Sequence, residues 1–326
     1  MRIDTFLQLI VTTAVLALGG CLHPQNPSGA AVVDDCTPEQ DANCGQAEYL
    51  SGIWRQGRLA SDQPKIEGES FEVDVEAALY TESALLTDAF ARLNHSDPER
   101  SEVYFLGIAG DGTERVFTRE VSAMRNHFDA LHSLEGRNIS LLNDRTAIGE
   151  QPMATRTSIA RSIMALASKM DLDQDILVLY VSSHGSESHQ ILLRNPAIGI
   201  ADLSAQDLSA MLESSGIKWQ AIFVSACFSG GFIEPLRRDT RLIMTAAAAD
   251  KASFGCSDDA ELTYFGRALL AAFEEPGDIQ SAFQRTTQII TERESEEGVE
   301  ASEPQLFIGR EMASKLEEEP GVLLKP

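Results

Sequence analysis

Basic residues are scarce in this chain of 326 residues. It contains 26 Lys and Arg side chains against 50 Asp and Glu, which gives a formal net charge of −24. A negative charge of this size repels nucleic acid and anionic membrane surfaces, and no local cluster of Lys or Arg offsets it. We therefore expect no nucleic-acid partner.

The common metal and nucleotide signatures are also missing. The sequence has neither an H-E-x-x-H motif nor paired C-x-x-C motifs. Gly110 and Gly112 belong neither to a dinucleotide fingerprint nor to a P-loop, so we interpret 109–113 as a tight turn between a strand and a helix. The sequence predicts no metal site and no cofactor.

Near the N-terminus, a short apolar run at 6–18 follows the charged end Met1-Arg2 and leads into Leu18-Gly19-Gly20-Cys21. This pattern is typical of an export signal and is short for a membrane span. The last four residues resemble the bacterial lipobox, whose cysteine is lipidated, and Leu22 after it favours the outer membrane. An ordinary signal peptide with an incidental cysteine is the alternative. We expect an exported protein, anchored by lipid on Cys21 to the periplasmic face of the outer membrane.

Cysteines are few, five in the whole chain. If the protein is exported, it enters an oxidising compartment, where Cys36 and Cys44 either close a small disulfide loop or remain free thiols. Cys227 and Cys256 lie in apolar or glycine-rich surroundings. We assign no catalytic role to Cys256, whose simplest role is packing.

The remaining chain has a simple organisation without internal repeats. We predict a signal peptide at 1–20, a flexible polar tether at 21–70, one domain at 71–318 and a tail at 319–326. Strands alternate with helices in the domain, which predicts an α/β fold with a mostly parallel sheet and helices on both faces. The expected strands are 103–108, 138–142, 176–181, 221–224, 241–245 and an edge strand at 306–308. The expected helices are 71–93, a segment around 121–131, one capped by Thr155 or Thr157, 203–215, 263–273 and 279–290, with a solvated acidic segment at 292–300.

Two of these strands end in reactive side chains. The run 176–181 leads into Ser182-Ser183-His184-Gly185, and 221–224 leads into Ser225-Ala226-Cys227. A strand, a crossover helix and a second strand place both strand ends at one edge of a parallel sheet. His184 and Cys227 would then lie side by side, as a base and a thiolate nucleophile do.

The surrounding residues suit this chemistry, although a buried structural cysteine remains an alternative reading. Backbone N–H groups at the turn after Cys227 can hold an oxyanion, and Gly185 can bring a second N–H close to a substrate. His189 is the nearest rival base, and we expect it to be exposed.

Several motifs in order resemble the legumain-type cysteine peptidases. They are Tyr180-Val181-Ser182-Ser183-His184-Gly185-Ser186, Ser225-Ala226-Cys227-Phe228-Ser229-Gly230, Thr245-Ala246-Ala247, Ser253-Phe254-Gly255-Cys256 and Thr263-Tyr264-Phe265-Gly266. The resemblance implies a caspase-like three-layer sandwich and a peptidase that needs no cofactor. It implies His184 as base, Cys227 as nucleophile, and the amides of Gly185 and Cys227 as the oxyanion hole.

The departures from the family pattern concern specificity. Phe228 and Arg267 stand where legumain-type enzymes have acidic residues implicated in the recognition of asparagine at the cleavage point. This argues against simple asparagine preference. Arg267 either faces the pocket, which would suit an acidic residue, or lies on the surface. Ser225, Phe228, Ser253 and Arg267 are the candidate pocket residues.

The sequence therefore predicts a cysteine endopeptidase that acts on peptide or protein substrates through a thioester intermediate. Two alternatives stay open. The same dyad can serve a transpeptidase that transfers the acyl group to an amine, or the fold can serve as a non-catalytic binding module.

Overall fold

The computed structural model describes residues 75–195 and 198–324. The predicted signal peptide and tether, with Cys21, Cys36 and Cys44, lie outside the described residues. Within them, no helix has the length and apolar character needed to cross a bilayer.

The centre of the fold is a six-stranded sheet in the order β2-β1-β3-β6-β7-β8. All neighbouring strands run parallel except β8, which pairs antiparallel with β7 at one edge. The strands are β1 (Val103–Ala109), β2 (Asn138–Leu142), β3 (Ile176–Ser182), β6 (Trp219–Ser225), β7 (Arg241–Thr245) and β8 (Gln305–Ile308). A separate antiparallel pair, β4 (Gln190–Ile191) and β5 (Leu203–Ser204), lies within the β3–β6 connection.

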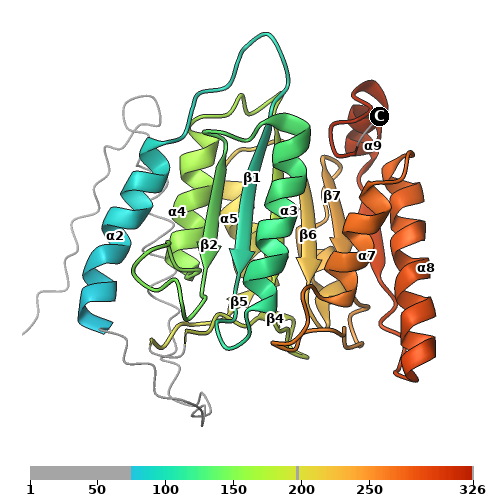
Figure 1. Ribbon diagram of the computed structural model, residues 1–326. Coiled ribbons are helices and arrows are strands. Elements are labelled where there is room, and N and C mark those ends of the chain that lie inside the picture. Colours follow the sequence, from blue (N-terminus) through green and yellow to red (C-terminus); the bar gives the residue numbers. More distant parts are fainter. Residues whose placement is uncertain (1–74, 196–197, 325–326) are drawn as a thin grey trace, which may run out of the picture.

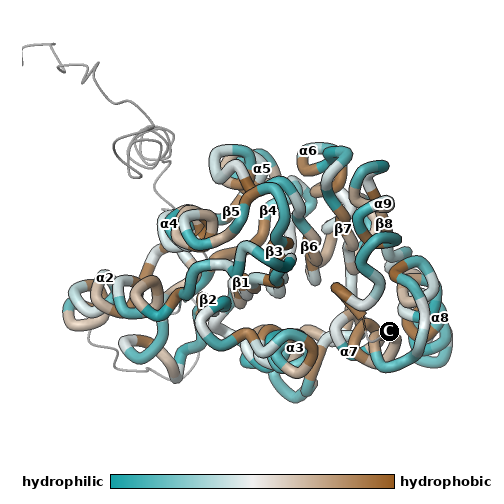
Figure 2. The backbone as a smooth tube through the Cα atoms, turned by 90° about the horizontal axis from the view of Figure 1, so that it is seen from above, coloured by the Kyte–Doolittle hydropathy of each residue, from teal (hydrophilic) through white to brown (hydrophobic). Residues whose placement is uncertain are grey.

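Helices cover both faces of this sheet, which explains the continuous apolar strands. Every residue of β1, β3, β6 and β7 is buried, as expected for parallel strands packed on both sides. Figure 2 shows α4, α5 and α6 on one face and α3 and α7 on the other, with α2 beside α4 and α8 beside α7. The helices are α2 (Val75–Ala91), α3 (Val116–His132), α4 (Arg156–Ala167), α5 (Ala205–Ser214), η1 (Ser229–Phe232), α6 (Ile233–Leu236), α7 (Tyr264–Phe273), α8 (Ile279–Glu297) and α9 (Arg310–Glu318).

Side-chain caps start several of these helices where the sequence supplies them. Thr155, one of the two expected caps, accepts a hydrogen bond from the Ser158 amide at the start of α4. Thr263 accepts a hydrogen bond from the Gly266 amide at the start of α7. Gly216 follows the crossover helix α5 with φ of 70°, a left-handed conformation that suits a residue without Cβ.

The C-terminal part of the domain differs most from the expectation. Helix α8 continues through the acidic segment to Glu297, where an ion pair of Arg293 with Glu297 supports its last turn. Helix α9 was not expected. Beyond it, Leu323 and Leu324 of the expected tail are buried against the core.

The arrangement confirms a three-layer α/β sandwich with a mostly parallel sheet. The parallel strands point the same way, so their carboxyl ends meet at one edge, which is the lower edge in Figure 1. The loops that follow β1, β3 and β6 therefore gather at that edge, with those of β1 and β6 on either side of the loop after β3.

Candidate active site

The pairing of β3 with β6 brings His184 and Cys227 to the same place. Ser182 at the end of β3 is the register partner of Ser225 at the end of β6. His184 and Cys227 each follow their strand by two residues. The Ser183 amide donates a hydrogen bond of 3.1 Å to the Ser225 carbonyl, which continues the pairing past the strand ends.

Gly185 packs directly against the backbone of Cys227. A Cβ at position 185 would collide with the Cys227 carbonyl oxygen and come within 3.2 Å of the Ala226 side chain. Within the described part of the chain, no hydrogen bond occupies the backbone N–H of Gly185 or of Cys227. Two backbone donors without a hydrogen bond among the described residues therefore lie on neighbouring loops at the sheet edge.

The chain turns sharply after Cys227. Phe228 has φ of 56°, a left-handed conformation that is uncommon for a residue with a bulky side chain. Its amide donates a hydrogen bond of 2.7 Å to the Lys251 carbonyl, which fixes the turn. Helix η1 begins at the next residue, so Cys227 lies between the end of a strand and the start of a short helix.

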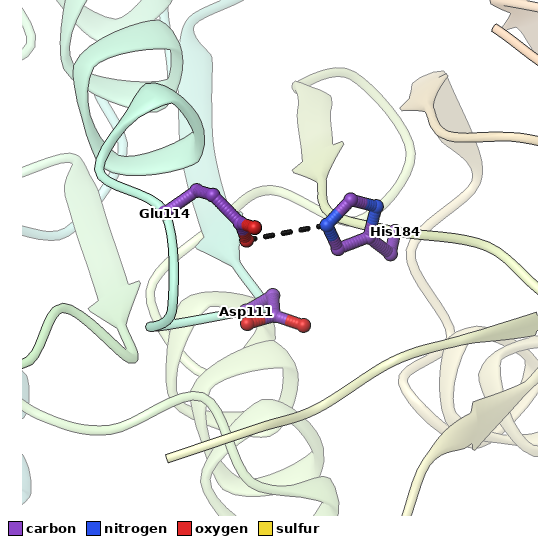
Figure 3. Close-up of side chains that lie close together, drawn as sticks. All are labelled: Asp111, Glu114 and His184. Carbon is purple, nitrogen blue, oxygen red and sulfur yellow. Dashed lines mark hydrogen bonds and ion pairs between the residues drawn. The ribbon is translucent and has the colours of Figure 1, made fainter. Parts of the chain in front are cut away.

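The imidazole of His184 is half-buried and has partners of two kinds. Its Nε2 lies 3.2 Å from the Oε2 atom of Glu114, a contact that is drawn as the dashed line in Figure 3. The ring also has a hydrogen bond with the Cys256 side chain. The edge of the Phe117 ring packs on it at 5.0 Å between centroids. Burial alone would lower the pKa of His184, but the bonds with Cys256 and Glu114 outweigh it and raise the pKa to about 10. The bond with His184 is also the main reason why the pKa of Glu114 lies below its usual range.

The loop after β1 adds a second carboxylate beside this pair. Asp111 is 1% exposed, and its Oδ1 accepts hydrogen bonds from the Thr113 amide and hydroxyl. One oxygen of Asp111, one of Glu114 and one ring nitrogen of His184 all lie within 4.8 Å of one another, which makes them a group that could hold a metal ion.

The thiol of Cys227 faces a loop between β7 and α7. Its Sγ accepts a hydrogen bond of 3.3 Å from the Ser253 amide and lies 3.7 Å from the Ser253 hydroxyl. The same loop carries Cys256, the thiol in contact with His184. Both cysteines are free and partly exposed. Of the candidate pocket residues, Ser253 is therefore the one in contact with Cys227.

The other candidate pocket residues occupy different surroundings. Ser225 is 2% exposed, and its hydroxyl pairs with that of Thr263 at 3.1 Å, which places it in the core. Phe228 is half-buried at the turn. Arg267 lies on the surface, where its guanidinium pairs with the exposed Glu261 at 3.5 Å.

His189 is half-buried, whereas the sequence predicted an exposed side chain. Its ring packs against Gly231, and its Nδ1 lies 3.2 Å from the Phe228 carbonyl oxygen. The reason is a hairpin in which Gly185 pairs antiparallel with Ile191 of β4. This hairpin brings His189 next to the turn that follows Cys227. His189 thus supports the turn.

The sequence also did not predict a buried carboxylate, that of Glu120, next to the carboxyl end of β3. Glu120 of α3 is fully buried and accepts hydrogen bonds of 2.9 Å from the hydroxyls of Tyr180 and Ser182. Its second oxygen accepts a hydrogen bond of 2.8 Å from the Thr263 amide. This side chain therefore ties α3 to β3 and to the start of α7, close to the end of the strand that carries His184.

Sequence reasoning also missed Asp111 and Glu114, because the loop after β1 was interpreted only as a turn. A signal for both was present. Strand β1 pairs in parallel with β3, and Ala109 lies opposite Ser182. The acidic residues in the loop after β1 must therefore lie near His184 in the loop after β3.

Comparison with known proteins finds a family match in the region that contains His184 and Cys227. Residues 162–315, which contain both strand ends, match the model of the Peptidase C13 family. No curated protein sequence matches the chain. The crystal structure of caspase-1 from Spodoptera frugiperda aligns with a TM-score of 0.44 and 13% identity, over 67% of this chain and 88% of that chain. Residues 162–315, which are 154 of the 326 residues, are therefore similar to the Peptidase C13 family of cysteine peptidases.

Proposed function

We propose that the protein is a cysteine endopeptidase in which Cys227 is the nucleophile and His184 the base. The observation that carries this proposal is the register of β3 and β6. It pairs Ser182 with Ser225, and His184 and Cys227 each follow two residues later. Both residues lie within the segment that matches the Peptidase C13 family.

The local geometry supports a defined division of roles. Glu114 accepts a hydrogen bond at Nε2 of His184, which holds the ring in one orientation and leaves the other ring nitrogen for proton transfer with a thiol. A protonated His184 next to the site stabilises the thiolate form of a cysteine. Glu114 thus acts as a positioning residue, because it acts through His184.

The reaction follows from these roles. The Cys227 thiolate attacks the peptide carbonyl carbon, and the negative oxygen of the tetrahedral intermediate is held by the amides of Gly185 and Cys227. The C–N bond then breaks as His184 donates its proton to the leaving amine, and a thioester remains. Water activated by His184 hydrolyses the thioester, releases the acid product and restores the thiolate.

The presence of two thiols near His184 makes a paired substitution the sharpest test. We expect Cys227→Ala to abolish cleavage of a diverse peptide mixture, whereas Cys256→Ala, the matched control in the same site, retains it. Both variants should keep the circular dichroism spectrum of the parent protein. Full turnover by Cys227→Ala, or loss of turnover in Cys256→Ala alone, would contradict the assignment.

Analysis of the products separates hydrolysis from transfer. In the presence of an added amine, a hydrolase gives free carboxylate products, and a transpeptidase gives amide products from the same thioester. We expect carboxylate products, because the proposal assigns water as the acceptor. Predominant amide products would assign the dyad to transpeptidation.

A further inference from the structure

Three potential metal ligands converge beside the proposed catalytic histidine. Asp111 and Glu114 come from the loop between β1 and α3, and His184 follows β3. Figure 3 shows the carboxylate of Glu114 facing the ring of His184, with Asp111 beside them. Each side chain offers one ligand atom within 4.8 Å of the other two. The ligand set therefore comprises one imidazole nitrogen and two carboxylate oxygens.

Asp111 provides a second and independent observation. Its side chain is fully buried, yet within the described residues its Oδ2 atom has no hydrogen-bond partner. The guanidinium of Arg194 forms an ion pair of 3.8 Å with that oxygen. Burial of a carboxylate oxygen without a hydrogen bond is costly, so this side chain, which belongs to the group, has an oxygen that a cation would stabilise.

The two carboxylates are also held in place. The Thr113 hydroxyl lies 2.5 Å from Oδ1 of Asp111 and 2.5 Å from Oε2 of Glu114. A hydroxyl has only one proton to donate, so it cannot satisfy both oxygens at once. The Thr113 amide holds Oδ1 of Asp111 from a further side, at 2.9 Å. Such supporting contacts orient ligands before an ion binds.

We propose that Asp111, Glu114 and His184 bind a divalent transition-metal ion of the Zn²⁺ type, and that the bound ion inhibits the peptidase. Metal binding stands on the geometry alone, whereas its inhibitory effect rests on the proposed function. An ion on Nε2 would displace the proton that Nε2 shares with Glu114 to solvent and would fix the remaining ring proton on the other nitrogen. That nitrogen could then not accept a proton from a thiol, so His184 would no longer act as a base.

The dimensions and the ligand types favour this kind of ion. Bonds of about 2.0–2.2 Å from Zn²⁺ to nitrogen and oxygen place tetrahedral ligands about 3.4 Å apart. The distance of Nε2 of His184 to Oε2 of Glu114 is already 3.2 Å. One Asp111 oxygen lies within 4.8 Å of both atoms, so a closer approach by at most about 1.4 Å would complete three sides of such a site. Mg²⁺ prefers an octahedron of oxygens, whereas imidazole with carboxylates suits Zn²⁺. The two carboxylates balance the charge of the ion, whereas the positive charge of Arg194 beside Asp111 disfavours its binding.

Direct binding tests the site without reference to catalysis. Co²⁺ titration followed by visible absorption, and Zn²⁺ titration followed by calorimetry, would be carried out on the full chain carrying Cys227→Ala and Cys256→Ala. We expect binding to persist without these thiols and to weaken about tenfold or more when Asp111→Asn or Glu114→Gln is added. Asp202→Asn is the matched control, since its carboxylate interacts with Arg194 and Asp111 but lies outside the group, and it should weaken binding far less than the two ligand substitutions.

Inhibition of the peptidase tests the consequence. Zn²⁺ should inhibit the protein with both thiols present, a chelator should reverse it, and Asp111→Asn should raise the inhibition constant about tenfold or more, relative to its own uninhibited rate. Binding that is lost with the two thiols, or that is the same in Asp111→Asn and the parent, would overturn the proposal. If Cys227→Ala proves fully active, the proposed function fails, and Asp111-dependent Co²⁺ binding still confirms the site.

Discussion

His184 shows how strongly individual contacts define the site at the scale of single residues. Its ring lies between the Glu114 carboxylate and the Cys256 thiol, while the Cys227 thiol accepts a hydrogen bond from Ser253. The two thiols therefore differ in their surroundings. Cys227 lies at the turn, where its amide and that of Gly185 have no hydrogen bond among the described residues and can hold an oxyanion, and Cys256 contacts His184 from the loop between β7 and α7.

Glu114 offers a prediction at this scale. We expect Glu114→Ala to lower kcat by about tenfold to a hundredfold, because the ring of His184 loses its orienting partner and proton transfer becomes less efficient. KM should change little, since Glu114 acts through His184. Glu114→Gln keeps an oxygen that can accept the hydrogen bond, so it should restore part of kcat.

The measurement is a steady-state comparison of kcat and KM on one peptide substrate. Glu261→Gln is the control, because it removes an exposed carboxylate whose partner on the surface is Arg267. An equal loss of kcat in Glu114→Ala and Glu114→Gln, together with a lower unfolding temperature, would indicate a purely structural role instead.

The residues that sequence reasoning found and missed differ in a physical way. His184 and Cys227 each come three residues after the end of a continuous apolar run. Their position at the sheet edge could therefore be predicted from the order of elements. Glu114 lies in a loop five residues beyond the end of β1, where no periodicity sets the direction of a side chain. Contact of Cys256 with His184 depends on the path of a long irregular loop, which no local pattern determines.

At the scale of elements, the site depends on how closely the loops after β3 and β6 approach. We expect Gly185→Ala to destabilise the protein by about 1–3 kcal/mol, because the new methyl group collides with the Cys227 carbonyl and forces the two loops apart. The same separation would displace the two amides of the proposed oxyanion hole, so kcat should fall as well. Urea denaturation and peptide hydrolysis measure the two effects.

Gly199→Ala is the matched control for this substitution. A Cβ at position 199 meets no atom of the described residues within 4 Å, and the residue has no left-handed φ. It should therefore leave both stability and kcat unchanged. A stable and fully active Gly185→Ala protein would show that the loops separate at no cost and would contradict the close packing.

The elements of the sheet could be predicted well, because buried parallel strands read as uninterrupted apolar runs. Strand β2 has the predicted bounds, and β7 likewise. The helices of the C-terminal part were harder, since the acidic end of α8 and the mostly polar α9 lack an apolar face wide enough to detect. Glu294 illustrates the reason. It reads as a solvated side chain, yet it is buried and accepts hydrogen bonds from the Ser302 amide.

At the scale of the whole molecule, charge and anchoring must be considered together. A net charge of −24 disfavours adsorption to an anionic membrane. Within the part of the chain that the structure describes, no helix could span a bilayer. We propose that attachment to the cell envelope depends on lipid at Cys21, because the Leu18-Gly19-Gly20-Cys21 motif resembles a lipobox.

This proposal predicts a clear change in fractionation. In a bacterial host, the parent protein should sediment with membranes and incorporate a labelled fatty acid, whereas Cys21→Ala should lose the label. The variant protein, if its signal peptide is still cleaved, should move to the soluble periplasmic fraction, since a net charge of −24 disfavours binding to an anionic surface. Cys36→Ala is the matched control and should stay membrane-bound and labelled. A parent protein without label, or a labelled Cys21→Ala variant, would contradict lipidation at this residue and favour an ordinary cleaved signal peptide.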